Sequence, residues 1–427
     1  MGSRRPKVVF WNHVPATSVV GRFNAVARRG NLDFEVWFSQ LEGTTRRWDP
    51  SPGSWEFPCR VLKEQPFLGK TIKAPFAELL QTHPDLLVAS YDTVGHILGL
   101  CVASALGTRI AFRVLPTYTA WYPRKLWKEQ IKHLLFTAAD AAKVSGEDAK
   151  VLAMQYGMPA ERISTVTQSI DFAHFAGAVA LRKTVGVDLR KRLGLDGCTF
   201  IYVGRLWRGK GLDDLFEAYL KLRLTCDRVS LLIVGEGVDG AIYREKYRNT
   251  PGVRFTGHIR SDDLPGYYSA ADALVFPTLG DPHGVVVEEA MAAGLPVICT
   301  TEAGDIKRRV PEGEAGFVVP VHDPDTLAKR MLRLADDPNE RQLMGAKAGQ
   351  VARGCGHEKY AIEFDNFVQE ALSHERCRTI QAGIVRAAGT AVLRFWRGDA
   401  PATLLDVQSA ASPGSSNSSR ELLRSVE

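Results

Sequence analysis

Short apolar runs alternate with amphipathic helical stretches along most of this chain, and that alternation constrains its fold more than any other feature. The helical stretches include Gly21–Arg29 and Thr93–Ala105. The apolar runs of the first half are Lys7–Trp11, Phe34–Phe38, Leu86–Ala89, Ile110–Val114 and Ala142–Val144. Strands that are apolar at nearly every position are buried on both faces, which is typical of a parallel sheet covered by helices.

The pattern restarts near residue 199, after a stretch at Ser169–Gly197 in which the apolar period weakens and which we interpret as a hinge region. Gly211–Leu222 is predicted to be a helix because its apolar side chains recur on one face. The second set of strands is predicted at Thr199–Val203, Ser230–Val234, Val253–Phe255, Ala273–Phe276, Pro296–Thr300 and Gly316–Val319. The chain is therefore predicted to be an α/β protein with two doubly wound domains.

The length and composition fit this organisation. The 427 residues are 45% hydrophobic and 24% charged, which suffices for two cores. We predict an N-terminal domain over residues 1–195, a second domain over 196–356, and helices over about 357–398 that pack back on the first domain. The Ser-rich tail, 399–427, is predicted to be disordered.

Charge and cysteine content exclude several classes of function. A formal charge of +6 suits anionic small molecules or an anionic membrane surface, and it is too small to indicate a nucleic-acid partner. The seven cysteines form no CxxC pair, which indicates reduced thiols rather than disulfides or a zinc site. No signal peptide is expected, and the longest apolar stretch, Val94–Leu106, has the length of a buried helix. We expect a cytoplasmic protein.

The segment 274–298 carries the strongest chemical signal. A predicted strand, a polar loop and a helix expected to begin near Gly284 follow one another there. Ligands bind at the carboxyl ends of such strands, and unpaired amides at a helix start suit a phosphate. Those amides belong to Gly284, Val285 and Val286.

Acidic side chains in this segment are candidate ligands for hydroxyl groups. Glu289 lies just over one turn into the predicted helix, where its carboxylate could accept hydrogen bonds from ribose hydroxyls. Asp281, in the loop, could accept them from a sugar. The alternative for Glu289 is an acidic residue that only complements the helix dipole. Glu288 is interpreted as a solvated neighbour without a role.

The segment 202–212 is another loop between a strand and a helix, and it combines glycines with cations. Gly204 permits a tight turn there. Arg205 and Lys210 are predicted to stabilise the charge that a pyrophosphate gains as its bond to a sugar breaks. Arg208 is interpreted as a surface cation.

Two weaker signals follow further strands. The glycine-rich turn at 232–237 lacks the spacing of a dinucleotide-binding fingerprint. A nucleotide base could stack or form hydrogen bonds near His258 and Ile259, although a lone histidine is more often structural.

These segments, in this order and spacing, resemble the large family of retaining glycosyltransferases of the GT-B fold, family four, which includes sucrose synthase and many bacterial polysaccharide transferases. The resemblance covers roughly Phe200 to Glu370 and is weaker in the N-terminal half. It implies two Rossmann-like doubly wound domains facing a central cleft, with the acceptor bound by the first domain and the nucleotide-sugar donor by the second. The segments that carry it are 202–212, 232–237, 255–260 and 274–298.

The resemblance also implies roles for residues on the donor side. The family's paired glutamates match Asp281 and Glu289, so the first acid is shorter here by one methylene. Glu289 would bind the ribose and Asp281 the sugar, while Arg205 and Lys210 would hold the donor phosphates. The residues that would complete donor binding are Gly204, His258, Ile259, His283, Gly284, Val285 and Val286.

The family's chemistry retains the anomeric configuration by front-face attack assisted by the leaving phosphate. Neither an enzymic nucleophile, nor a metal, nor a cofactor is therefore expected. Acceptor-side residues are assigned only by analogy, and the candidates are His13, Asp92 and Arg113.

The sequence thus predicts a retaining glycosyltransferase that moves a sugar from a UDP- or GDP-sugar to a glycan or lipid-linked acceptor, in cell-surface polysaccharide or glycoconjugate biosynthesis. A phosphorylase would need a lysine for pyridoxal and a longer chain, and no acid and base set for an epimerase stands out. A catalytically inactive nucleotide-sugar-binding subunit stays open as the alternative.

Aromatic and basic residues are interleaved in two places, Trp121–Lys132 and Arg376–Arg397. Both patterns suit an interfacial patch on the anionic inner face of a membrane. A solvated helix face, or a C-terminal helix packed on the first domain, explains them equally well.

Overall fold

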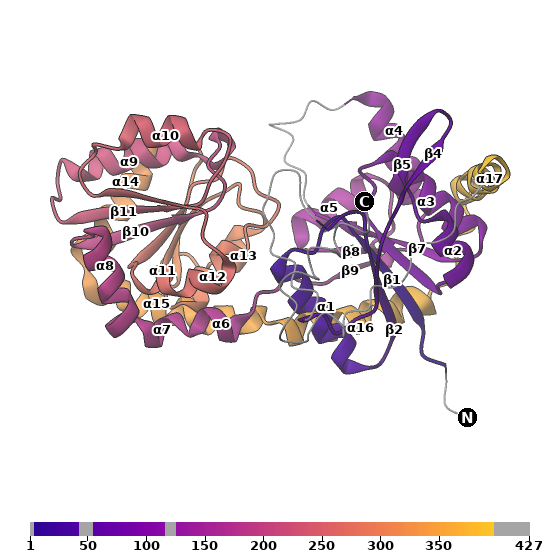
Figure 1. Ribbon diagram of the computed structural model, residues 1–427, viewed down its shortest axis with the longest axis horizontal. Coiled ribbons are helices and arrows are strands. Elements are labelled where there is room, and N and C mark those ends of the chain that lie inside the picture. Colours follow the sequence, from indigo (N-terminus) through magenta and orange to yellow (C-terminus); the bar gives the residue numbers. More distant parts are fainter. Residues whose placement is uncertain (1–3, 42–53, 116–124, 397–427) are drawn as a thin grey trace, which may run out of the picture. The chain divides into compact units, whose positions relative to one another are not determined.

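The computed structural model describes residues 4–41, 54–115 and 125–396, and two separate parallel sheets organise them (Figure 1). The chain divides accordingly into two units. Unit 1 contains the described residues up to 114, residues 125–167 and those from 360 onward, and unit 2 contains residue 115 and residues 168–359. The predicted tail at 399–427 lies outside the described residues.

Unit 1 is built on a seven-stranded sheet of order β3-β2-β1-β6-β7-β8-β9, in which every neighbouring pair is parallel. Its strands are β1 Lys7–Asn12, β2 Asp33–Phe38, β3 Cys59–Val61, β6 Leu86–Ala89, β7 Arg109–Val114, β8 Ala141–Val144 and β9 Ile163–Thr165. A separate antiparallel hairpin joins β4 Glu64–Phe67 to β5 Lys70–Lys73. The strand order reverses between β1 and β6, which places ligand-binding loops at the carboxyl ends of these strands.

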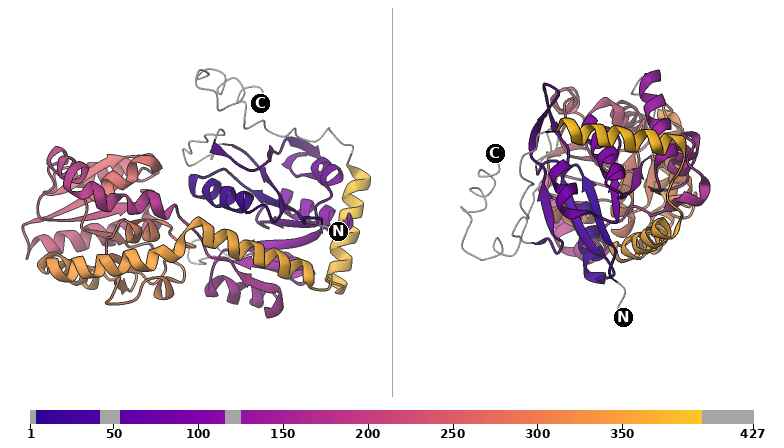
Figure 2. Two further views of the ribbon diagram at one scale, coloured as in Figure 1. Left: turned by 90° about the horizontal axis from the view of Figure 1, so that it is seen from below. Right: turned by 90° about the vertical axis from the view of Figure 1, so that its right-hand side faces the viewer.

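Helices cover both faces of this sheet because its strands are apolar on both sides. Val8 and Phe10 of β1 face the cluster that α1 and α16 cover, whereas Val9 and Trp11 face the cluster that α3 and α17 cover. The helix α17, yellow in Figure 2, is in contact with α3. The helices are α1 Thr17–Arg29, α2 Phe76–Thr82, α3 Val94–Ala105, α4 Leu126–Ala138, α5 Glu147–Gln155, η3 Ala160–Arg162, α16 His357–Ser373 and α17 Ile380–Phe395.

Unit 2 repeats the design with a six-stranded parallel sheet of order β12-β11-β10-β13-β14-β15. Its strands are β10 Cys198–Val203, β11 Val229–Val234, β12 Val253–Gly257, β13 Ala273–Phe276, β14 Val297–Thr300 and β15 Gly316–Val319. Its main helices are α6 Phe172–Ala176, α7 Ala178–Leu181, α8 Val187–Leu193, α9 Leu212–Arg223, α10 Gly240–Tyr247, α11 Leu264–Ser269, α12 Val286–Ala292, α13 Ile306–Arg309, α14 Pro324–Asp336 and α15 Pro338–Ala352. Short turns complete the unit: η5 Arg208–Lys210, η6 Ser261–Asp263 and η7 Arg353–Cys355.

The predicted hinge at Ser169–Gly197 is wrong, because most of this stretch is helical and packs into unit 2. Phe175, Ala178 and Leu195 are buried in its core. The apolar period is hidden because α7 and α8 are short and are joined by a π-helical segment, Arg182–Gly186, which shifts the register of side chains. The structure therefore divides the chain at residue 168, where the sequence had placed the boundary at 195.

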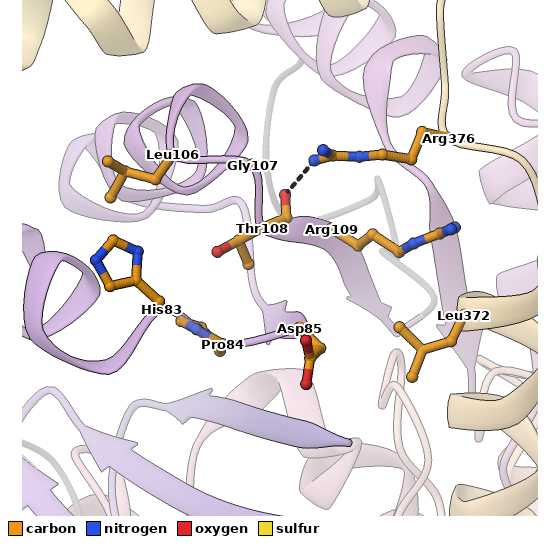
Figure 3. A pocket seen from close by; sticks show the side chains of 9 residues that line it. All are labelled: His83, Pro84, Asp85, Leu106, Gly107, Thr108, Arg109, Leu372 and Arg376. Carbon is orange, nitrogen blue, oxygen red and sulfur yellow. Dashed lines mark hydrogen bonds between the residues drawn. The ribbon is translucent and has the colours of Figure 1, made fainter. Parts of the chain in front are cut away.

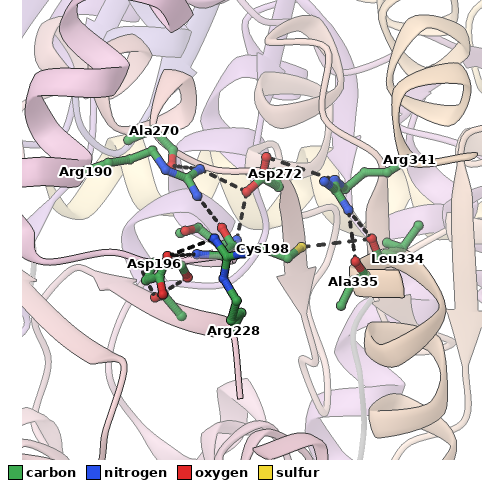
Figure 4. Close-up of polar contacts among 12 residues, drawn as sticks. Arg190, Asp196, Cys198, Arg228, Ala270, Asp272, Leu334, Ala335 and Arg341 are labelled. Carbon is green, nitrogen blue, oxygen red and sulfur yellow. Dashed lines mark hydrogen bonds and ion pairs between the residues drawn. The ribbon is translucent and has the colours of Figure 1, made fainter. Parts of the chain in front are cut away.

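A network of polar contacts connects the helical stretch at Ser169–Gly197 to the sheet of unit 2 (Figure 4). Arg190 of α8 donates to the Asp272 carboxylate at 2.9 Å and to the Ala270 carbonyl oxygen at 3.2 Å. The same carboxylate accepts from the backbone N–H of Thr199 on β10 at 2.8 Å. Asp272, just before β13, thus links α8 to the central strands of unit 2.

Candidate functional site

The loops that follow β10, β11 and β13 meet at the carboxyl edge of the unit 2 sheet. The backbone N–H of Gly204 donates to the carbonyl oxygen of Val234, and the backbone N–H of Leu206 donates to the carbonyl oxygen of Glu236, at 3.0 Å each. Gly211 has a φ of 67°, and a Cβ atom there would collide with the carbonyl oxygen of Pro277. Glycine is therefore required for the loops after β10 and β13 to approach this closely.

Lys210 and Asp281 form a buried ion pair between two of these loops. Lys210 is 7% exposed, and its Nζ pairs with Oδ2 of Asp281. Oδ1 of Asp281 accepts from the backbone N–H of His283 at 2.9 Å. Burial alone would raise the pKa of Asp281, but the charge and hydrogen bond of Lys210 outweigh it, so the pKa lies below its ordinary value. The Asp281 carboxyl group is thus ionised at neutral pH.

Arg205, five residues before Lys210, carries a buried donor with no acceptor. Its Nε is shielded from solvent and has no hydrogen-bond partner in the described part of the chain. The guanidinium lies 5.7 Å from the ring centroid of Trp207. A buried charged donor without an acceptor is costly, and an anionic ligand would remove that cost.

Glu289 is held on α12 in a largely uncharged setting. The Tyr268 hydroxyl donates to its Oε2 at 3.1 Å. Burial raises the pKa of Glu289 to about 7, although the Tyr268 hydrogen bond acts in the opposite direction. This carboxyl group can therefore gain or lose a proton near neutral pH.

The interpretation of Glu288 as a solvated neighbour is wrong. Glu288 is 3% exposed and forms a bidentate ion pair with Arg309, at 2.6 Å to Nε and 2.7 Å to Nη2. His283 Nε2 lies 3.5 Å from the same carboxylate. Burial would raise the pKa of Glu288, but the Arg309 charge holds it at about 2. The partner lies on α13, far along the chain, so local spacing gave no sign of it.

Arg309 is a residue that sequence reasoning missed altogether. Besides Glu288, its guanidinium donates to the carbonyl oxygen of His283, and to those of Ala303 and Gly304 at 2.8 Å each. It also donates to the carbonyl oxygen of Gly284 at 3.2 Å. Arg309 therefore ties the loop before α12 to the loop after β14.

The start of α12 differs slightly from the expected helix start. Gly284 has a φ of 71°, outside the helical region, and α12 begins at Val286. A Cβ atom on Gly284 would collide with the Phe276 ring. Among the described residues, the backbone N–H groups of Gly284, Val285 and Val286 donate to no protein acceptor. His258, by contrast, is exposed and Ile259 is half-buried after β12, where neither makes a polar contact within the described ranges.

The acceptor-side candidates lie at the carboxyl edge of the unit 1 sheet. His13 follows β1, Asp92 follows β6, and Arg113 is near the end of β7. The structure adds His96, whose Nδ1 lies 3.0 Å from Asp92 Oδ1 and whose ring packs on Trp11 with centroids 4.2 Å apart. His96 was read only as part of an apolar helix.

A cavity of about 260 Å³ lies at the opposite edge of this sheet (Figure 3). It is lined by His83, Pro84, Asp85, Leu106, Gly107, Thr108, Arg109, Leu372 and Arg376. Its main polar groups serve the fold: Arg109 donates to the His374 carbonyl oxygen at 2.6 Å, and Asp85 accepts from the backbone N–H of Lys7 at 2.7 Å. It lies at the amino ends of β6 and β7, away from the candidate residues.

Two further features are absent from the described ranges. No group of three or more His, Cys, Asp or Glu side chains there could hold a metal ion. No helix there is both long and apolar enough to cross a membrane.

Comparisons with known proteins show similarity to one family over part of the chain. Residues 197–337 match the family of glycosyl transferases group 1. The D-inositol 3-phosphate glycosyltransferase of Thermomonospora curvata is 30% identical over 227 residues, which are 50% of this chain and 52% of that protein. Sulfoquinovosyl transferase SQD2 of Arabidopsis thaliana is 26% identical over 310 residues, 69% of this chain and 58% of that protein. The chain thus spans only about half the length of these curated relatives.

Solved structures extend the likeness to most of the chain. HepE of Anabaena in complex with UDP has a TM-score of 0.69 and 18% identity, covering 85% of this chain and 99% of HepE. Sucrose-phosphate synthase from Thermosynechococcus elongatus has a TM-score of 0.64 and 19% identity, covering 86% and 98%. The likeness to the glycosyl transferases group 1 thus lies in residues 197–337, and the two doubly wound units are those of the GT-B fold.

Proposed function

We propose that this protein is a retaining glycosyltransferase that transfers a sugar from a UDP- or GDP-sugar. The observation that carries the proposal is the buried pair of Lys210 and Asp281 in the same loop region as the unpartnered Nε of Arg205. Arg205 adds a positive charge to the loop region of this pair, at the carboxyl edge of the unit 2 sheet, where a diphosphate would fit. HepE, which has the same fold, was solved with UDP and with UDP-glucose.

In this proposal the donor lies across the loops of unit 2. Lys210 and Arg205 bind the diphosphate, together with the amides at the start of α12. Asp281 accepts hydrogen bonds from the sugar, and Glu289 accepts them from the ribose. The base lies near His258 and Ile259, after β12.

The transfer itself needs only positioned charges. As the bond between the sugar and the diphosphate breaks, negative charge grows on the leaving oxygen, and Lys210 and Arg205 stabilise it. The acceptor hydroxyl attacks from the same face and gives its proton to the departing phosphate, so the anomeric configuration is retained. No metal and no cofactor takes part.

The acceptor is proposed to be a glycan or a lipid-linked molecule in the synthesis of cell-surface polysaccharides or glycoconjugates. A structural neighbour, WaaB, is a lipopolysaccharide outer core galactosyltransferase, and SQD2 is a sulfoquinovosyl transferase. His13, Asp92 and Arg113 remain the acceptor-side candidates because they share the carboxyl edge of the unit 1 sheet.

We also propose that unit 1 docks from the cytoplasmic side on an anionic membrane surface. Val385 and Val392 of α17 are buried, but Ile380 and Phe395 on its other side are 81% and 73% exposed. Trp127, at the start of the neighbouring α4, is 57% exposed. Exposed apolar side chains near lysines and arginines suit such an interface. The rest of the predicted patches, residues 121–124 and Arg397, lie outside the described residues.

A screen of nucleotide sugars tests the proposed reaction. UDP- and GDP-sugars are added singly, and the thermal unfolding midpoint of the full chain is measured. A donor at about 100 times its dissociation constant adds about 2.7 kcal/mol of stability. Product formation with the stabilising donor then separates an active transferase from an inactive binding subunit, and no stabilisation by any nucleotide sugar would contradict both.

A further inference from the structure

Two basic side chains lie next to each other on one face of the unit 1 sheet. Arg113 on β7 and Lys143 on β8 are register partners in parallel strands, so their side chains leave the sheet on the same side. Ala111 and Ala141, two residues earlier on each strand, belong to the core cluster that α1 and α16 cover. The two cations therefore lie at the helix-covered face, near the carboxyl ends of their strands.

Few contacts in the described part of the chain would stabilise a positive charge on Lys143. It is 1% exposed, and the one hydrogen bond of its Nζ in the described part of the chain is a long one, 3.4 Å to the Val166 carbonyl oxygen. The Tyr360 ring lies 5.1 Å from Nζ. Burial lowers the pKa of Lys143 well below its ordinary value, and the charges of Arg22 and Arg113 lower it further.

Arg113 is in a similar position. Its Nε is buried and has no hydrogen-bond partner within residues 4–41, 54–115 and 125–396. The residue as a whole is half-buried, and it lies one residue before the carboxyl end of β7. A donor of this kind is costly in the fold unless something accepts its hydrogen bond.

A third cation and the nearby acids complete the surroundings. Arg22 of α1 lies 5.3 Å from the centroid of the same Tyr360 ring. Glu363 of α16 accepts from the N–H and the hydroxyl of Thr167 at 2.8 Å each, and Asp92 contacts His96. In the described ranges no ion pair joins an acid to Arg113 or Lys143, so positive charge predominates here.

The arrangement of these basic side chains favours one chemical class of ligand. Like charges side by side on neighbouring strands destabilise a sheet, and burial adds to that cost. A tetrahedral oxyanion offers several acceptors at once, which a planar guanidinium and an ammonium group bind well. Ligands of parallel sheets bind at the carboxyl edge, where both side chains lie.

We propose that Arg113 and Lys143, with Arg22 beside them, bind a phosphate group carried by the acceptor. The inference that the phosphate belongs to an acceptor rests on the proposed function, whereas the inference of a phosphate site does not. This anion is distinct from the donor diphosphate, which is assigned to Lys210 and Arg205 in unit 2. A free phosphorylated sugar and a phospholipid headgroup share this chemistry.

The test measures stabilisation of the full chain by inorganic phosphate at constant ionic strength, with and without saturating UDP. Lys143→Met and Arg113→Gln are compared with Lys70→Met, which removes an exposed lysine of unit 1. Phosphate should raise the unfolding midpoint of the wild type and of Lys70→Met. In the two site variants its dissociation constant should rise by about tenfold or more, the scale of one charge-assisted hydrogen bond, while the response to UDP is unchanged.

Glucose 6-phosphate and phosphatidylglycerol vesicles distinguish the two sources. A loss of glucose 6-phosphate binding in Lys143→Met supports a soluble acceptor, and a loss of vesicle binding supports a lipid headgroup. Three outcomes overturn the site: an undiminished phosphate response in both variants, a response that disappears once UDP is present, or no wild-type response to any of the three probes. A failure to bind both UDP and GDP would contradict the proposed function, and the comparison of phosphate binding between the variants could still be interpreted.

Discussion

Lys210 is buried in the loop after β10, and its ammonium group pairs with the Asp281 carboxylate. Lys210→Ala should reduce kcat/KM by about 10²- to 10³-fold, because a preorganised donor to a developing charge contributes roughly 2.7–4 kcal/mol. Steady-state transfer assays with the donor found by the screen measure this. Arg208→Ala is the matched control, since Arg208 is an exposed cation in the same loop. Equal losses in both variants would contradict the assignment of Lys210 to the donor phosphates.

Glu289 gives a prediction on pH because burial raises its pKa to about 7. A carboxyl group whose pKa is raised by folding contributes its full stabilisation when the pH is below the pKa it has in the unfolded chain. This contribution is lost as the pH rises through the pKa of the folded state, here about 7. Glu289→Gln should therefore gain stability relative to the wild type between pH 5 and pH 8, by roughly 3 kcal/mol at most. Urea unfolding at each pH measures the difference.

The control for this pH effect is Glu245→Gln, which changes an exposed acid of the same unit. Its stability relative to the wild type should stay constant across the same range. A constant difference for Glu289→Gln as well would mean that Glu289 titrates as an ordinary carboxyl group in the folded protein.

The sequence could place those candidate site residues whose position depends on local chain geometry. Lys210 and Asp281 each lie in a loop directly after a strand, and the structure pairs them. Glu288 was misjudged because its partner Arg309 lies on another helix, and no local period relates the two. The buried pairing of His96 with Asp92 was missed for a similar reason, since an apolar helix hides a polar side chain within it.

At the scale of elements, the apolar strands of four or more residues were predicted closely, and the two strands of three residues were not. The predicted strand Leu86–Ala89 is β6 itself, and β13 also matches its predicted range. The strands β3 and β9 have three residues each and lie at the sheet edges, so they leave no alternating or continuous apolar pattern. Helices as short as α6 and α7 fall below the length at which a period can be recognised.

The link between α12 and α13 gives a prediction on stability. Arg309→Ala should cost about 3–5 kcal/mol of unfolding free energy, because it leaves Glu288 buried without its counter-ion. The double variant Glu288→Met with Arg309→Met should lose less, since no charge is then left unpaired. Urea unfolding of the single and double variants measures both. Equal destabilisation of the two would show that the carbonyl oxygens served by Arg309 matter more than its ion pair.

The exposed apolar side of α17 gives a prediction on membrane binding. Ile384→Glu should weaken binding to vesicles of anionic lipid by about tenfold or more, because full burial of an isoleucine side chain contributes about 1.5–3 kcal/mol. Vesicle sedimentation measures the partition. Thr390→Glu adds the same charge to an exposed position of the helix, away from the apolar side. Equal loss in both variants would indicate a general charge effect, and undiminished binding of Ile384→Glu would remove α17 from the interface.

At the scale of the whole molecule, the alternation of strands and helices predicted two doubly wound units, and both are present. The boundaries between the two units were harder to predict. A boundary depends on which hydrophobic core a helix packs into, and the residue pattern of the helix itself does not reveal this. The helices from residue 168 onward contribute to the core of unit 2. Residues from 360 onward belong to unit 1, although they follow unit 2 in the sequence.

This division predicts how fragments of the chain will fold. A fragment of residues 168–359 should unfold cooperatively in urea, whereas a fragment of residues 196–359 should be far less stable or unfolded. The shorter fragment lacks the buried side chains of Ile170, Phe175 and Leu189, and burial of each contributes about 1.5–3 kcal/mol. The sum approaches the 5–15 kcal/mol that stabilises a typical domain. Fragments of equal stability would show that residues 168–195 are a separable connector after all, as the weakened apolar period of that stretch had suggested.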